Sequence, residues 1–151
     1  MQSDYIKALN ENGKIAFSPK GNSMWPTLKS KKNTVIIEKK SQRLNRFDVG
    51  FYVRADGTYI LHRVIDVCDG GYIFCGDSQS KKEKVAEQNV YGVMTGFYRG
   101  KKFISVTAPK YKKQVEKIYK NDKKRVKKAR FFMRLKRLAS LFSAAKGDSD
   151  D

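Results

Sequence analysis

Short runs of β-branched and aromatic residues, separated by glycine-containing turns, constrain the fold of this chain most. Asp56-Gly57 lies between two such runs, 49–54 and 59–67, and Asp-Gly is a preferred turn of two-stranded hairpins. Asp69-Gly70-Gly71 then separates the second run from residues 72–76. Strands joined by turns this short pair antiparallel, so the pattern predicts a mainly β, antiparallel domain.

The flanking segments extend this prediction to residues 1–108. A short helix is expected over residues 3–12, where Ser3 can cap its start and Gly13 can end it in a left-handed conformation. The remaining predicted strands are 14–18, 34–38, 90–98 and 103–106. A chain of 151 residues therefore fits one β domain followed by a terminal extension.

The positive charge of the chain, +18 overall, is concentrated in that extension. Residues 1–98 contain 15 Lys and Arg against 10 Asp and Glu, whereas residues 99–151 contain 18 against 5. Such an excess indicates an anionic partner, either lipid headgroups or nucleic acid. We expect a basic helical tail over residues 109–146 and a disordered acidic end over residues 147–151.

Apolar residues in the tail recur at the three- and four-residue spacing of a helix that Pro109 can start. With cations on the remaining surface, this pattern predicts a basic amphipathic helix that lies in a membrane interface. The predicted membrane-contact residues are Phe131, Phe132, Leu135, Leu138 and Phe142. Two alternatives stay open: the apolar stripe packs on the β domain, or the Lys-rich run 123–128 binds RNA.

The sequence favours neither a metal site nor a membrane-spanning segment. Cys68 and Cys75 lack the spacing of a Cys-x-x-Cys motif, so we expect free thiols, no metal and no cofactor. No run approaches 18 apolar residues, and the N-terminus lacks the basic-then-apolar order of a signal peptide. The protein is therefore expected to be cytoplasmic and peripheral at the inner face of the membrane.

Ser23 lies between a glycine, which widens the range of backbone conformations, and a proline, which narrows it. In Gly21-Asn22-Ser23-Met24-Trp25-Pro26-Thr27-Leu28, the glycine permits a left-handed conformation and the proline fixes its own φ. A serine hydroxyl is a poor nucleophile until a base takes its proton. The chain contains one histidine, His62. Taken singly, Ser23 is an ordinary turn residue and His62 an ordinary strand residue.

Three motifs follow one another in the chain: the segment 21–28, Leu61-His62-Arg63-Val64-Ile65, and Phe74-Cys75-Gly76-Asp77-Ser78-Gln79. In this order they resemble the serine, base and aspartate boxes of the signal peptidase I family. Histidine at the base position is similar to the archaeal and endoplasmic-reticulum branch, where bacterial enzymes have lysine. Residues 46–51 are more weakly similar to the Gly-Asp-hydrophobic segment that opens a strand in this family. The resemblance covers about residues 16–97.

The resemblance implies a serine endopeptidase in which Ser23 attacks, His62 is the base and Asp77 orients the imidazole. Gly21 stands where bacterial members have an oxyanion-hole hydroxyl, so the Ser23 backbone N–H and the Asn22 amide would serve instead. Glu83 occupies the position of a second acidic residue and is a support candidate. The implied substrate is a leader segment or a membrane-proximal peptide. The family's N-terminal membrane anchor is not seen, so removal of secretory leaders is not carried over.

Two other functions remain open at this point. A self-cleaving repressor-like protease shares the β scaffold, but it usually has a lysine base and a separate DNA-binding domain, so His62 counts against it. In the other alternative, the β domain is catalytically inactive and the basic tail binds anionic lipid or nucleic acid.

Overall fold

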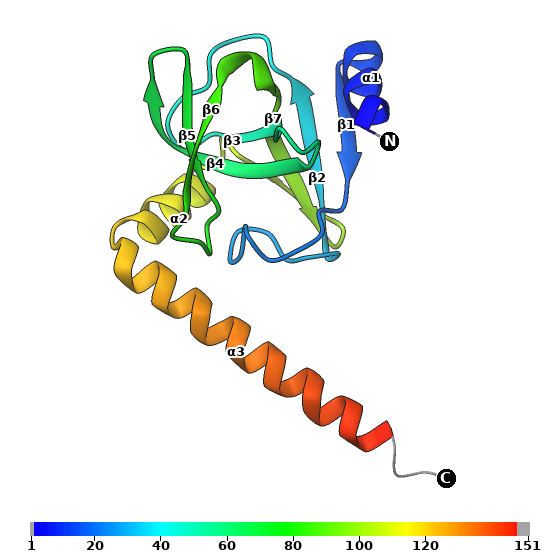
Figure 1. The fold of residues 1–151 in the computed structure, drawn as a ribbon, viewed down its shortest axis with the longest axis vertical. Coiled ribbons are helices and arrows are strands. Elements are labelled where there is room, and N and C mark those ends of the chain that lie inside the picture. Colours follow the sequence, from blue (N-terminus) through cyan, green and yellow to red (C-terminus); the bar gives the residue numbers. More distant parts are fainter. Residues whose placement is uncertain (1, 148–151) are drawn as a thin grey trace.

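The computed structural model describes residues 2–147, which form an antiparallel sheet of eight strands and three α-helices (Figure 1). This confirms the predicted mainly β, antiparallel class with a helix at the C-terminal end. The strands are β1 Lys14–Phe17, β2 Asn33–Lys39, β3 Val49–Val53, β4 Tyr59–Cys68, β5 Gly71–Cys75, β6 Lys82–Ala86, β7 Val90–Arg99 and β8 Lys102–Ser105. The helices are α1 Gln2–Asn12, α2 Pro109–Tyr119 and α3 Asp122–Gly147, with a 3₁₀ turn η1 at Glu87–Asn89.

The strand order in the sheet is β1-β2-β7-β3-β4-β5-β6, and β8 pairs with β7. The predicted hairpins β3–β4 and β4–β5 form, and the predicted strands β7 and β8 pair as a third hairpin. Gly57, Gly70 and Gly100 have the positive φ that the three turns require. Strand β6 was not predicted, because Lys82-Glu83-Lys84 lacks the β-branched and aromatic residues of a strand. It forms at the sheet edge by pairing with β5.

The sheet buries side chains on both faces in its middle strands. Phe51 and Leu61 belong to one buried cluster, whereas Tyr52 and Val64 belong to the other. Successive side chains of a strand point to opposite faces, so neighbours along β3 and β4 contribute to different clusters. The first cluster contains Leu9, Met24, Leu28, Val35, Ile37, Val49, Phe51, Leu61, Met94, Phe97, Tyr111 and Val115. The second contains Leu44, Tyr52, Val64, Tyr72, Phe74, Val85 and Val90.

The segment expected to be one tail over residues 109–146 consists of two helices with different surroundings. Pro109 starts α2 as predicted, but Tyr111 and Val115 of α2 are buried in the first cluster. The expected boundary at residue 108 thus precedes a helix, α2, that packs against the strands of the β domain. The amide oxygen of Asn121 accepts a hydrogen bond from the Lys124 backbone N–H and caps the start of α3.

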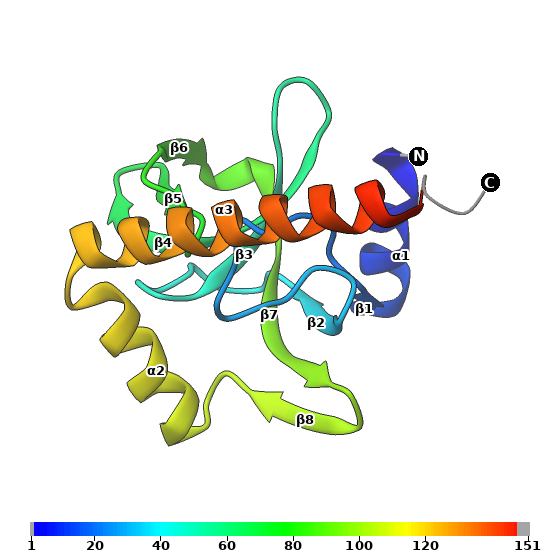
Figure 2. The ribbon, with the colours of Figure 1, turned by 90° about the horizontal axis from the view of Figure 1, so that it is seen from below.

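Helix α3 crosses one end of the β domain, beneath the loop that contains Ser23 (Figure 2). Its first half packs on the domain: Ala129 is buried, and the ring of Phe132 stacks on Trp25 with centroids 4.3 Å apart. Within residues 2–147, no helix is both long enough and apolar enough to cross a membrane. Residues 148–151 of the predicted acidic end lie outside the described residues.

Candidate active site

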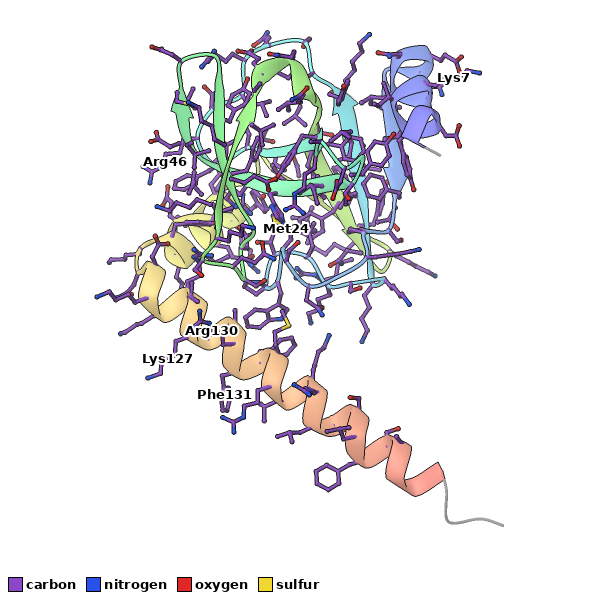
Figure 3. The ribbon with its side chains drawn as sticks, viewed as in Figure 1. Lys7, Met24, Arg46, Lys127, Arg130 and Phe131 are labelled. Atoms are coloured by element: carbon purple, nitrogen blue, oxygen red, sulfur yellow. The ribbon has the colours of Figure 1, made fainter. Side chains whose placement is uncertain are left out.

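The turn that carries Ser23 is anchored from the protein interior. Gly21 has φ +84°, a left-handed conformation, and its backbone N–H donates to the Ser30 hydroxyl oxygen at 3.1 Å. Met24 and Leu28 are buried in the first cluster, and Figure 3 shows Met24 between the turn and the sheet. Ser23 itself is only partly buried. Burial of the flanking side chains therefore holds the serine at the surface.

Gly76 allows this turn to approach the strand that contains His62. Arg63 pairs with Cys75 in the β4–β5 ladder, and one further step in that register places Gly76 opposite His62. A Cβ at Gly76 would lie 2.6 Å from the Ser23 carbonyl oxygen, which is too close for any other residue type. The Ser23 carbonyl oxygen therefore lies against Gly76, the residue that the extended register places opposite His62.

Ser23 and His62 line one groove with a volume of about 370 Å³. The groove wall is largely apolar and aromatic. Aromatic side chains from four elements contribute to it: Tyr5 of α1, Phe17 of β1, Phe51 of β3 and Tyr59 of β4. The first two predicted catalytic residues thus line the same groove.

Tyr52 and Glu83 fix the proton on one nitrogen of the His62 imidazole. The Tyr52 hydroxyl lies 3.3 Å from Nδ1 of His62 and donates to a Glu83 carboxylate oxygen at 2.8 Å. Burial, with Glu83 beside it, raises the pKa of Tyr52, so the phenol keeps its single proton. Because that proton is directed to Glu83, the phenol oxygen must accept from Nδ1–H. The other ring nitrogen, Nε2, is then left with the lone pair of a base.

Burial also sets the proton affinity of this base. Desolvation lowers the pKa of His62 from 6.5 to about 4, with the Arg54 charge adding to the decrease and the Glu83 charge opposing it. The imidazole is therefore neutral well below neutral pH. At this buried position the pKa of His62 therefore lies below that of an exposed imidazole.

Asp77 does not orient His62, contrary to the expectation from the motif. Arg63 donates to both of its carboxylate oxygens, at 2.8 and 2.7 Å, and hydroxyl groups of Thr27 and Tyr119 donate to the same two oxygens. Arg63 follows His62 in β4, so its side chain points to the opposite face and Asp77 is held there with it. Burial would raise the pKa of Asp77, but Arg63 and these hydrogen bonds outweigh it and keep the pKa below its ordinary value.

Glu83, the support candidate, contacts the base through Tyr52. Arg54 holds its carboxylate with two hydrogen bonds, at 2.7 and 2.9 Å, and these bonds are the main reason that the pKa of Glu83 is lowered. Sequence reasoning missed Tyr52. The predicted β3–β4 hairpin contained the signal, because its register pairs Tyr52 with Ile60, which shares a face with His62 two residues further on.

The two expected oxyanion donors are the Ser23 backbone N–H and the Asn22 side-chain amide. Among the described residues, the Ser23 backbone N–H makes no backbone hydrogen bond, so it is available to an oxyanion. The Asn22 side-chain oxygen is buried and has no partner within residues 2–147. That oxygen is an acceptor, so no observed contact shows Asn22 in the role of a donor.

The predicted membrane-contact residues divide between two faces of α3. Phe131, Leu135, Leu138 and Phe142 are exposed, and their spacing places them on one helix face. Figure 3 shows Phe131 and Lys127 on the side of α3 away from the strands. Phe132, about 100° further around the helix, instead stacks on Trp25. Phe132, which the sequence assigned to the membrane-contact set, thus differs from the other four residues because its ring contacts the domain.

Comparison with known proteins assigns neither a family nor a function to this chain. The sequence matches no model of a known protein family and no curated protein.

We predict that Asp77→Asn lowers the free energy of unfolding by about 3–5 kcal/mol, because it leaves the buried Arg63 charge without a counter-ion. Denaturant unfolding at pH 7 measures this, with Asp69→Asn in the exposed β4–β5 turn as the matched control. The pKa of Asp77 is lower in the folded than in the unfolded protein, so its ionised carboxylate stabilises the fold at any pH above the unfolded-state pKa near 3.9. This stabilisation is lost as the pH falls through the folded-state pKa of Asp77. The difference between wild type and Asp77→Asn should therefore narrow below about pH 4. An unfolding midpoint equal to that of Asp69→Asn contradicts the prediction.

Proposed function

We propose that this chain is a serine endopeptidase that resembles signal peptidase I, with Ser23 as nucleophile and His62 as base. The observation that carries the proposal is that these two residues, distant in sequence, line one apolar groove. The fixed Nδ1–H proton supports it further, because it leaves His62 with one nitrogen able to accept a proton.

Acyl transfer then needs only groups already present in this groove. Nε2 of His62 takes the Ser23 proton as the hydroxyl oxygen attacks the scissile carbonyl, and the imidazolium gives that proton to the leaving amine. The Ser23 backbone N–H donates to the developing oxyanion. In the second half of the reaction, His62 activates a water that hydrolyses the acyl-enzyme. The Glu83 charge, conveyed through Tyr52, stabilises the transient imidazolium.

The proposed location is the cytoplasmic face of a membrane, with α3 lying peripherally in the anionic interface. The exposed face formed by Phe131, Leu135, Leu138 and Phe142 supports this, since α3 also contains ten Lys and Arg and one Asp. Apolar burial and attraction to anionic headgroups act together in such helices, with about 1 kcal/mol per cation near the surface. The proposed substrate is a leader segment or a membrane-proximal peptide.

The nucleophile is tested by covalent labelling with a fluorophosphonate, which needs no knowledge of the substrate. We expect wild type to be labelled and both Ser23→Ala and His62→Ala to lose labelling, with little further loss in the double variant because residues that act as a unit are not additive. Ser41→Ala, at an exposed serine outside the groove, controls for labelling of other hydroxyls. Equal labelling of Ser23→Ala and wild type contradicts the assignment.

The pH dependence of labelling tests the environment of the base. The base acts when it is neutral, so the labelling rate should be constant above about pH 5 and fall as the pH drops through about 4, the pKa of His62. Tyr52→Phe removes the acceptor for Nδ1–H, and we expect a labelling rate at least roughly tenfold lower at every pH. An inflection near pH 6.5, or one above about pH 9, is the contrary result.

The exposed face of α3 is tested by sedimentation with vesicles of phosphatidylglycerol and phosphatidylcholine. Leu138→Ser with Phe142→Ser should weaken binding at least roughly tenfold, because each buried apolar side chain contributes about 1.5–3 kcal/mol. Phe103→Ser, an exposed aromatic of β8, is the control and should bind like wild type. Binding by wild type to RNA with none to vesicles supports the nucleic-acid alternative for the tail.

A further inference from the structure

Arg125 of α3 is bound to the loop that holds the Ser23 backbone. Its Nη1 lies 3.1, 2.8 and 2.8 Å from the carbonyl oxygens of Gly76, Asp77 and Gln79. We propose that Arg125 is a positioning residue for Ser23, so that α3 is required for the rate of acyl transfer. This inference rests on the proposed peptidase function.

The Arg125 side chain has the surroundings of a fixed structural group. It is only 6% exposed, its guanidinium packs over the Tyr119 ring at 4.8 Å from the centroid, and Nε is 3.2 Å from an Asp122 carboxylate oxygen. A planar guanidinium that is stacked on one side and hydrogen-bonded at its edge loses little further freedom. Arg125 therefore holds the three carbonyl groups in one arrangement.

The loop of residues 76–79 is in turn hydrogen-bonded to the turn that carries Ser23. The Ser78 backbone N–H donates to the Ser23 carbonyl oxygen at 2.9 Å, and the Ser78 hydroxyl lies 3.0 Å from the same oxygen and 2.8 Å from that of Asn22. Arg125 binds the carbonyl groups on either side of Ser78. The contacts thus run from α3 through residues 76–79 to the residue proposed to attack the substrate.

A contact of this kind affects the rate of the chemical step because nucleophile and base must be correctly spaced. A displacement of about 1 Å in a reacting group can cost about 100-fold in rate. The groove that binds the substrate is lined by other elements, so its affinity for a ligand should be little affected. Loss of Arg125 should therefore lower the maximal labelling rate and leave probe binding nearly unchanged.

The experiment measures fluorophosphonate labelling of the full chain at several probe concentrations, which separates the maximal rate kinact from the half-saturating concentration KI. We expect Arg125→Ala to lower kinact at least tenfold while KI changes less than twofold. Arg125→Lys, which keeps a cationic donor, should recover part of the rate, and millimolar guanidinium should raise the rate of Arg125→Ala but not of wild type. Arg46→Ala is the matched control, because Arg46 also packs over a ring, that of Phe47, at the surface.

The outcomes separate this inference from the proposed function and from a purely structural role. Labelled wild type with unchanged kinact in Arg125→Ala overturns the inference and leaves the peptidase proposal in place. A loss of rate that follows the fraction of unfolded protein, measured by circular dichroism, and that neither lysine nor guanidinium recovers also overturns it. If wild type is not labelled at Ser23, the peptidase proposal fails and the inference fails with it.

Discussion

The buried ion pair between Arg63 and Asp77 is the interaction on which the arrangement of the site depends. Both side chains are fully excluded from solvent, and each ion loses several kcal/mol of hydration on burial. Hydroxyl groups of Thr27 and Tyr119 complete the bonding of the carboxylate, while Arg63 also donates to the Phe47 carbonyl oxygen and the Tyr111 hydroxyl. One charged pair thereby joins β4, the loop after β5, the serine turn and both ends of α2.

This pair explains why the aspartate of the motif is not the partner of the histidine. His62 and Arg63 are neighbours in β4, so a carboxylate that satisfies one lies on the face opposite the other. A buried guanidinium needs a counter-ion far more than a neutral imidazole does, and Asp77 lies with Arg63. The groups that contact the imidazole are instead Tyr52 and, through it, Glu83, which share the face of His62.

The local features of the fold could be predicted from the sequence, whereas long-range side-chain contacts could not. Asp56-Gly57 and Gly70 specify their turns through backbone conformation alone, so the hairpins were predictable. Strand β6 forms because β5 offers an unpaired edge, which its own composition does not indicate. Tyr119 reaches Asp77 from 42 residues further along the chain, and no periodicity within α2 reveals that contact. The order of the three motifs identified Ser23 and His62 as candidates. Only the strand register shows that His62 and Arg63 point to opposite faces of β4.

Helix α3 shows why a single apolar stripe was too simple an interpretation. Successive helical residues are about 100° apart, so Phe131 and Phe132 cannot share the centre of one face. Phe132 lies on the side that includes buried Ala129 and Arg125, while Phe131 continues toward Leu135 and Leu138 on the exposed side. The side facing the domain contacts the serine turn and the loop that holds it. The same helix therefore presents an apolar, cation-rich surface outward and binds the loop beside Ser23 inward, so the proposed membrane contact and the position of the proposed nucleophile depend on one element.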